Sequence, residues 1–288
     1  MTAPPQKRLG IVVGAGSVKC AAAIGLFRVL QREGIRPDVV VGCSAGCFYA
    51  TILALGWDAK RAAELTAGLW TREVTSKPDR LSMLRLLFPR LFGFNERFGL
   101  KSDHLIMQRL HEAYGDRTFA DTIIPLFLTA TDFATGEQVV LHEGRLIDAM
   151  RASIAIPFAF RPWEINGRLL IDGFLSDPLP IGVAIREGAD IILAMGFESP
   201  HQTRITSGTR FAFQLSSIMT NNLLRASFAF HGTAHHDEII PIIPEFKERI
   251  RVFDTAKIPY IIEEGERAME AQMPYIRRLL GIGPGNSR

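Results

Sequence analysis

The feature that most constrains the fold is the order of elements at the start of the chain. Residues 9–14 form a short apolar run ending in glycine, and small residues and a helical pattern ending at Gly34 follow it. Residues 38–41 have the composition of a buried strand, and 45–56 that of a helix ending at Gly56. This order predicts a parallel sheet covered by helices, because parallel strands need a crossover between them.

The rest of the chain continues this alternation without an internal repeat. Further strands are predicted at 124–131, 168–171, 190–195 and 239–243, and further helices at 103–113, 145–154, 180–187, 210–230 and 259–280. We therefore expect one three-layer α/β/α domain with a mainly parallel central sheet. Its predicted extent is residues 9–281, between a flexible N-terminus (1–8) and a C-terminal tail (282–288).

Composition narrows the classes of function. The chain has 288 residues, of which 47% are hydrophobic, with 33 basic and 30 acidic side chains. This composition is typical of a globular protein, and the charge is too balanced for a dedicated nucleic-acid binder. No apolar run approaches the roughly 18 residues of a membrane span, and the first residues do not form a secretory signal. With only three cysteines, we expect a cytoplasmic protein without a disulfide framework.

The sequence GCSAG at 42–46 follows the second predicted strand directly and opens a helix. A nucleophile elbow needs this context: a sharp strand-to-helix turn with serine at its apex and small residues on both sides. The helix N-terminus stabilises negative charge that develops beside the serine. We interpret Ser44 as a candidate nucleophile and Gly42 and Gly46 as the elbow glycines. A strand-turn-helix with a capping serine is the alternative.

Residues 14–20 (GAGSVKC) lie at the end of the first predicted strand. Small residues here would let backbone N–H groups point into a cleft, as an oxyanion hole requires. The spacing matches neither of the common glycine-rich phosphate-binding motifs, which makes a phosphate-binding loop a weaker interpretation. A tight turn of small residues between strand and helix is the remaining alternative.

Residues 163–173 (WEINGRLLIDG) contain Asn-Gly between two apolar stretches, which predicts a β-hairpin. Asp172 lies at the end of the second strand of this hairpin, beside a glycine that permits a tight bend. An aspartate at such a position can lie beside a nucleophile, although it is more often a turn residue.

Together these motifs resemble the patatin-like phospholipase family, lipid acyl hydrolases that use a Ser-Asp dyad without histidine. The resemblance extends from about Leu9 to Leu280, and its most specific part joins the elbow to the run RASIAIPFAFRP and the later Asp-Gly. It implies Ser44 as nucleophile, Asp172 as general base, a lipid or acyl-ester substrate, and no metal or cofactor. The implied oxyanion loop comprises Ala15, Gly16, Ser17, Val18 and Lys19, together with the amide of Ala45.

The chain departs from the family pattern at four positions. The family's run of glycines is Ala15-Gly16-Ser17 here, its closing glycine is Cys20, and Phe174 replaces a small residue after Asp172-Gly173. Backbone amides survive these replacements, but a non-glycine residue at positive φ is strained. The bulk of Phe174 is expected to reshape the pocket.

Two other functions remain open at this stage. A conventional Ser-His-Asp triad would draw its histidine from His231, His235 or His236, which follow the aspartate as that chain order requires. A lipid-binding or scaffold protein with an eroded oxyanion loop is the non-enzymatic alternative. Cys43 and Cys47 flank the elbow and are interpreted as small packing residues.

Residues 72–101 mix leucine and phenylalanine with arginine, and hold seven basic and three acidic residues. Pro89 predicts two short amphipathic pieces. Such a segment suits a lid or an interfacial insertion, with lipid contacts from Phe88, Phe92, Phe94 and Phe98 and a peripheral membrane contact. A peripheral helix with solvated arginines is the alternative. The apolar helix at 210–230 either covers the sheet or meets a second subunit of a homodimer.

Overall fold

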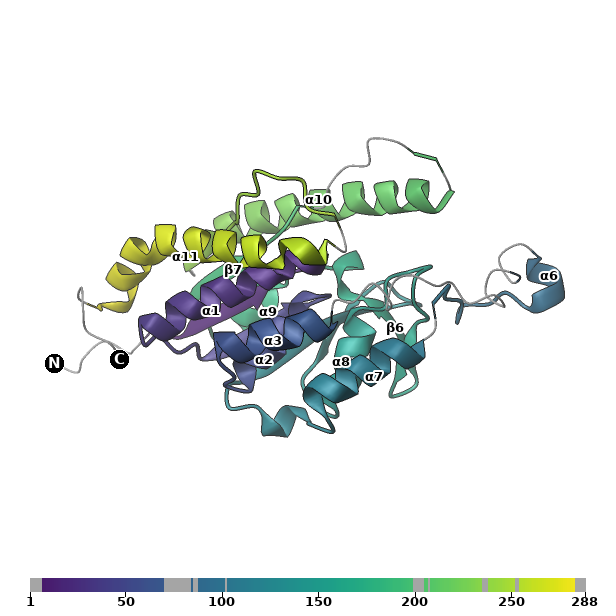
Figure 1. Ribbon diagram of the computed structural model, residues 1–288, viewed down its shortest axis with the longest axis horizontal. Coiled ribbons are helices and arrows are strands. Elements are labelled where there is room, and N and C mark those ends of the chain that lie inside the picture. The colour runs from purple at the N-terminus through teal and green to yellow at the C-terminus, as the bar shows by residue number, and fades with distance from the viewer. Residues whose placement is uncertain are drawn as a thin grey trace.

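The protein is described here from a computed structural model, which describes residues 7–69, 84, 88–101, 103–198, 205–206, 208–234, 238–251 and 254–282. Eight strands form one mainly parallel sheet with helices on both faces (Figure 1). The predicted fold class is confirmed. The predicted division into N-terminus, domain and tail stays a prediction, since residues 1–6 and 283–288 lie outside the described residues.

The sheet has the strand order β5-β6-β3-β2-β1-β7-β8, with β4 paired to β3 outside this path. Strands β1, β2, β3, β7 and β8 are parallel, whereas β4, β5 and β6 pair antiparallel. The strands are β1 (Leu9–Val13), β2 (Val39–Cys43), β3 (Leu126–Asp132), β4 (Gln138–Leu141), β5 (Trp163–Ile165), β6 (Arg168–Asp172), β7 (Ile191–Met195) and β8 (Glu238–Ile242). In β1, β2 and β7 every residue is buried, because helices cover both faces.

Most helices follow the sequence prediction, but the helix at Ala59–Leu69 was not predicted. The α-helices are α1 (Ala22–Arg32), α2 (Gly46–Ala54), α3 (Ala59–Leu69), α6 (Pro89–Phe92), α7 (Asp103–Tyr114), α8 (Leu146–Ser153), α9 (Ile181–Arg186), α10 (Gly208–Ala234) and α11 (Ile258–Leu280). Short 3₁₀ helices are η1 (Ser17–Ala21), η2 (Phe119–Asp121), η3 (Gly173–Leu175) and η4 (Thr255–Lys257). One apolar core joins α1, α2, α8 and α11 to the sheet, and a second joins α9 and α10 to its other face.

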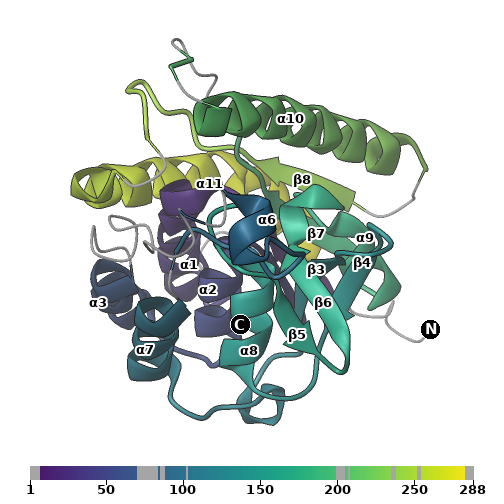
Figure 2. The same cartoon turned by 90° about the vertical axis from the view of Figure 1, so that its right-hand side faces the viewer.

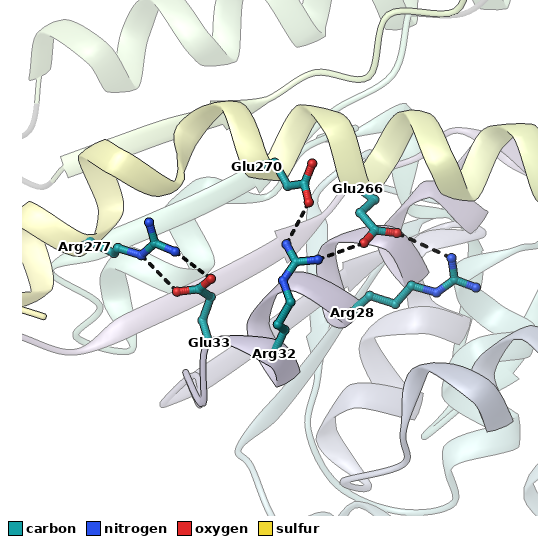
Figure 3. A network of polar contacts seen from close by, with 6 residues as sticks. All are labelled: Arg28, Arg32, Glu33, Glu266, Glu270 and Arg277. Atoms are coloured by element: carbon teal, nitrogen blue, oxygen red, sulfur yellow. Dashed lines mark hydrogen bonds and ion pairs between the residues drawn. The ribbon is translucent and has the colours of Figure 1, made fainter. Parts of the chain in front are cut away.

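The helices α1 and α11 cross at two glycines. A Cβ atom at Gly25 would lie 2.2 Å from the Ile262 carbonyl oxygen, and one at Gly265 would lie 2.0 Å from that of Ala22. These distances leave no room for a side chain. Ion pairs then join the two helices along their exposed sides (Figure 3).

The hairpin predicted at Asn166-Gly167 is present between β5 and β6, and both turn residues have positive φ, at 52° and 76°. Strand β4 was not predicted. Its four residues are all half-buried, so the alternation of buried and exposed residues that would identify a strand is missing.

The predicted 72–101 insertion is only partly described. Helix α6 begins at Pro89, as the proline predicts, whereas the piece before it falls largely on residues outside the described ranges. Residues 100 and 101 are tied to the body by hydrogen bonds from the Leu100 and Lys101 amides to the carbonyls of Phe158 and Ala159. Figure 2, viewed along the long axis from the α6 end, shows α6 in front of the sheet and α10 above it. Within the described ranges, no helix combines the length and apolar character needed to cross a bilayer.

Candidate active site

Ser44 occupies the sharp turn between β2 and α2. Its φ of 53° lies in the left-handed region, which is the strained conformation of a nucleophile elbow. The glycines on either side are required by close packing. A Cβ atom at Gly42 would lie 2.7 Å from the Cα of Cys47, and one at Gly46 would lie 2.2 Å from the Val13 carbonyl oxygen. The turn therefore packs closely against the end of β1, with Ser44 at its apex.

The Ser44 hydroxyl donates a hydrogen bond of 2.8 Å to Oδ2 of Asp172, which is 128 residues away in the chain. The sheet brings them together, because β3 lies between β2 and β6. Cys43 pairs with Thr129 on one side of β3, and Asp172 pairs with Ala130 on the other. The structure thus brings together Ser44 and Asp172, which two separate sequence motifs indicated.

Asp172 is fixed by three further hydrogen bonds. Its Oδ1 accepts from the Phe174 amide at 3.1 Å, its own amide donates to the Ala155 carbonyl, and its carbonyl accepts from the Thr131 hydroxyl. The neighbouring Gly173 packs against β3 so closely that a Cβ atom would lie 2.5 Å from the Thr129 carbonyl oxygen. The carboxylate therefore has one position and no freedom to turn away from Ser44.

The carboxyl group of Asp172 is fully buried, and this burial raises its pKa to about 7. The hydrogen bonds from the Phe174 amide and the Ser44 hydroxyl oppose that rise but do not cancel it. Among the described residues no cation pairs with Asp172. A carboxylate with such a pKa is an effective proton acceptor near neutral pH.

The backbone amide of Ser44 donates to the hydroxyl of Ser153 at 2.8 Å. Ser153 is fully buried at the end of α8, so this bond anchors the strained turn from the opposite side. Sequence reasoning missed this role. The only available signal was the position of Ser153 in the RAS run, which shows nothing about its partner.

Residues 14–18 comprise the end of the loop after β1 and the start of η1. Gly16 is extended, at φ −172°, and a Cβ atom there would lie 2.4 Å from the Phe197 ring. Ser17 has a φ of 57°, so the departure from glycine at this position carries the strain that the sequence suggested. The Ala15 amide donates to the Pro178 carbonyl, and Val18 is buried.

The backbone amides of Gly16 and Ala45 differ from that of Ala15. Within the described ranges, neither the Gly16 amide nor the Ala45 amide donates to a protein acceptor. Ala45 also stands at the N-terminus of α2, where the helix dipole favours negative charge. Both amides are therefore available as hydrogen-bond donors.

Lys19 is bound to the loop that follows β7. Its ammonium group donates to the Glu198 carbonyl at 2.7 Å and lies 5.7 Å from the centre of the Phe246 ring. Burial lowers its pKa. We therefore assign Lys19 to holding η1 against the loop that follows β7, rather than to contacting Ser44.

The three cysteines are buried near Asp172. Burial raises the pKa of Cys20, Cys43 and Cys47 well above the usual range of thiols, and the negative charge of Asp172 adds to the effect. A thiol with a raised pKa holds its proton at neutral pH and is a poor nucleophile.

Of the three histidines considered for a triad, His231 is in α10, where its ring lies near Gly182 at the start of α9. His235 and His236 lie outside the described residues. The Ser44 hydroxyl bonds directly to a carboxylate. No three of the described His, Cys, Asp and Glu side chains converge as metal ligands.

The phenylalanines of the predicted insertion have different environments. Phe88 and Phe94 are exposed, whereas Phe98 is buried between Phe94 and Phe158, with ring centres 4.7 and 6.5 Å away. The side chain of Phe92 lies outside the described part. Phe158 is itself half exposed at a φ of 64°, on the loop whose Ala155 carbonyl holds Asp172.

Comparison with known proteins identifies the family of the chain. A family model described as patatin-like phospholipase matches residues 11–185, which include both Ser44 and Asp172. The chain belongs to the patatin-like phospholipase family. This membership confirms the family resemblance of the sequence motifs.

Several curated proteins are similar to the chain over about two thirds of its length. It is 30% identical over 188 residues to an NTE family protein of Mycobacterium bovis, covering 65% of this chain and 48% of that protein. It is 28% identical over 204 residues to the neuropathy target esterase sws of Drosophila melanogaster, covering 69% of this chain and 13% of that protein. The chain thus spans about half the length of the former relative and far less of the latter.

Among solved structures, the crystal structure of VipD from Legionella pneumophila aligns with a TM-score of 0.49 at 16% identity. The alignment covers 93% of this chain and 67% of that chain.

Proposed function

We propose that this patatin-like protein is a serine acyl hydrolase that cleaves carboxylic ester bonds of lipids through an acyl-enzyme on Ser44. Asp172 is the general base. The observation that carries the proposal is the 2.8 Å hydrogen bond from the Ser44 hydroxyl to a fully buried carboxylate whose pKa is raised to about 7. A serine in a strained turn, bonded to a base of this strength, is a suitable nucleophile near neutral pH.

In the first half-reaction, the Ser44 oxygen attacks the ester carbonyl carbon while Asp172 accepts the hydroxyl proton. The amides of Gly16 and Ala45 are the proposed donors to the oxyanion, since they donate to no acceptor among the described residues. The tetrahedral intermediate then expels the alcohol, which takes the proton from Asp172. Ser44 is left carrying the acyl group.

In the second half-reaction, water attacks the acyl carbonyl and Asp172 accepts the proton of that water. Collapse of the second intermediate releases the fatty acid and returns the proton to Ser44. The same residues allow acyl transfer to another alcohol in place of water.

The segment 72–101 is proposed as a lid or lipid contact at this site. Phe88 and Phe94 are exposed, and the amides of Leu100 and Lys101 are bonded to the loop of Phe158 and Ala159. Three residues earlier, that loop bonds Asp172. The end of this segment is therefore hydrogen-bonded to the loop that also bonds Asp172.

Labelling with a fluorophosphonate probe and hydrolysis of soluble short-chain esters test the dyad. We expect Ser44→Ala to abolish both, and Asp172→Asn to lower the acylation rate by about 10²–10⁴-fold, the usual contribution of a general base. Asp177→Asn is the matched control, because Asp177 is also largely buried with a raised pKa and lies near the same turn. It should keep activity within a few fold.

Near-normal activity of Asp172→Asn would contradict the role of Asp172, and probe labelling of Ser44→Ala at the native rate would contradict that of Ser44. Replacing His231, His235 and His236 one at a time should leave acylation intact. A single histidine substitution that stopped acylation would instead support a triad.

A further inference from the structure

Arg151, near the C-terminal end of α8, is one of the largest fully buried side chains of the protein. Arginine is almost never fully buried unless its charge is paired. Here the Nη2 atom of Arg151 donates to the Asp103 carboxylate, at the start of α7, and also to the Arg161 carbonyl at 2.8 Å. One nitrogen atom thus joins α8 to two other parts of the chain.

This buried cation is not explained by a gain in stability. Its Nε and Nη1 atoms donate to no acceptor within the described ranges. A buried ion pair recovers the cost of leaving water only when its remaining donors are also satisfied, and an apolar side chain of similar volume is often at least as stabilising. The position of the guanidinium therefore points to another role.

The bond from Arg151 to the Arg161 carbonyl spans ten residues and closes the loop of residues 152–161. This loop holds both members of the proposed dyad. The Ser153 hydroxyl accepts from the Ser44 amide at 2.8 Å, and the Ala155 carbonyl accepts from the Asp172 amide at 3.1 Å.

The other side of loop 152–161 carries the end of the 72–101 segment. The Leu100 and Lys101 amides bond to the loop, and a Cβ atom at Gly99 would lie 2.4 Å from the Arg161 amide nitrogen. Asp103 follows shortly after these residues and accepts from the same guanidinium that closes the loop. Arg151 therefore bonds the loop and the segment packed on it at the same time.

The loop has a shape that needs support. Phe158 has a φ of 64°, and a bulky residue keeps such a strained conformation only where its surroundings fix it. The Arg151 guanidinium lies 5.3 Å from the centre of the Phe160 ring and 5.1 Å from that of Trp163. Both rings therefore limit the orientations open to the guanidinium group.

We propose that Arg151 is a positioning residue for the acyl transfer described above. By bonding Asp103 and the Arg161 carbonyl together, it keeps loop 152–161 in the shape that places Ser153 and Ala155 against the dyad. It acts through these two residues and not by touching the substrate. The catalytic part of this inference rests on the proposed function, whereas the structural part can be measured without any turnover.

The first test is the kinetics of Arg151→Met on a soluble short-chain ester. We expect kcat to fall about 10–100-fold, because a small displacement of reacting groups has an effect of this size. KM should stay within about twofold, and the unfolding midpoint should not fall, because Asp103 is 22% exposed and its charge keeps contact with water. A merely structural residue would instead lower the midpoint and leave kcat per folded molecule unchanged.

Glu164→Gln is the matched control. It breaks the exposed 2.7 Å ion pair of Glu164 with Arg97, which also joins the 72–101 segment to the chain that follows loop 152–161. Its kcat should stay within about twofold of the native value, because an exposed pair of this kind contributes little.

Two further measurements ask whether Arg151 acts through the loop. The double variant Arg151→Met with Ser153→Ala should lose no more than about threefold beyond its more damaged single variant, because both changes release the same contact. Amide hydrogen exchange at Ser44 and Asp172 should be about tenfold faster in Arg151→Met, since their acceptors are on the released loop.

A folded Arg151→Met protein with kcat within about twofold of the native value would overturn the inference, as would fully additive losses with Ser153→Ala. If Arg151→Met does not fold, Arg151→Lys decides. Its ammonium group ends one bond short of Nη2 and lacks the planar fork, so kcat should fall severalfold, and a native kcat would overturn the inference. If exchange is faster in Arg151→Met but native protein cleaves no ester, the positioning role stands and the hydrolase function fails. If kcat falls while exchange at both amides is unchanged, the hydrolase function stands and the positioning role fails.

Discussion

Carboxylates are held in opposite ways at the α1–α11 contact and at the candidate active site. Along α1 and α11, Glu33, Glu266 and Glu270 all pair with arginines, and the Glu33–Arg277 contact is 2.7 Å long (Figure 3). These side chains are partly exposed. Asp172 is fully buried and is bonded by one hydroxyl and one amide. In the first region each of these glutamates has an arginine partner, whereas no cation in the described part of the chain pairs with Asp172.

The difference separates stability from reactivity. A partly exposed ion pair contributes little free energy because water already stabilises both charges, and here the packed glycines beneath the pairs position the helices. A buried carboxylate without a cation destabilises the ionised protein, but its raised pKa makes it a better base. The fold is therefore held most firmly where no chemistry is proposed.

Adding one methyl group at the helix crossing should have the largest effect on stability. We expect Gly265→Ala to lower the free energy of unfolding by about 3 kcal/mol, because its Cβ atom would lie 2.0 Å from the Ala22 carbonyl oxygen and the helices must separate. Denaturant unfolding measures this. Gly68→Ala in α3 is the control, since its Cβ atom would meet nothing within 4 Å and should be neutral or slightly stabilising. Equal effects at the two glycines would contradict a packed crossing.

The pH dependence of stability should reveal Asp172. Its pKa is about 7 in the folded protein and about 3.9 in the unfolded chain, so between these values the folded state retains a proton that the unfolded state loses. Its contribution to stability is therefore present below pH 4 and is lost as pH rises toward 7, with a slope of at most about 1.4 kcal/mol per pH unit. Activity should change in the opposite sense, falling about tenfold per unit below pH 7 as the base is protonated.

The control for this pH effect is Asp172→Asn, which cannot ionise. Subtracting its unfolding free energy from that of the native protein at each pH isolates Asp172 from the other carboxylates. A difference that stays constant between pH 4 and 7 would show that the carboxyl group is not buried as described.

Removing an ion pair between α1 and α11 should have the smallest effect. We expect Arg277→Ala to lower stability by about 1 kcal/mol or less and to leave ester hydrolysis unchanged, because both side chains keep some contact with water. A double-mutant cycle with Glu33→Gln measures the coupling between the two. A loss as large as that of Gly265→Ala would mean that the ion pairs, and not the glycines, hold α11 in place.

Much of the fold could be predicted because it is encoded locally. The apolar runs of β1, β2 and β7 and the turn at Asn166-Gly167 need no knowledge of distant partners. The elbow at Ser44 is equally local, since it combines a strand, small residues and a helix start. Asp172 was identified by its place after a strand and by the family resemblance, whereas its distance from Ser44 depends on the sheet order.

Other features could not be predicted because they depend on tertiary contacts. The bond from Ser153 to the Ser44 amide joins α8 to an elbow 109 residues away, and the contact of Lys19 with Glu198 joins two loops. The apolar periodicity of α10 was visible in the sequence, but its direction was not. Periodicity shows that a helix has two faces and does not show which one meets the protein.

The burial of Cys20, Cys43 and Cys47 has a practical consequence. These are all the cysteines of the chain, and each is fully buried. The negative charge of Asp172 contributes to the raised pKa of all three thiols. A thiol reagent can therefore reach them only during transient opening of the structure around Ser44 and Asp172. The rate at which such a reagent modifies the native protein therefore reports how often this local opening occurs, and the measurement needs no label added to the chain.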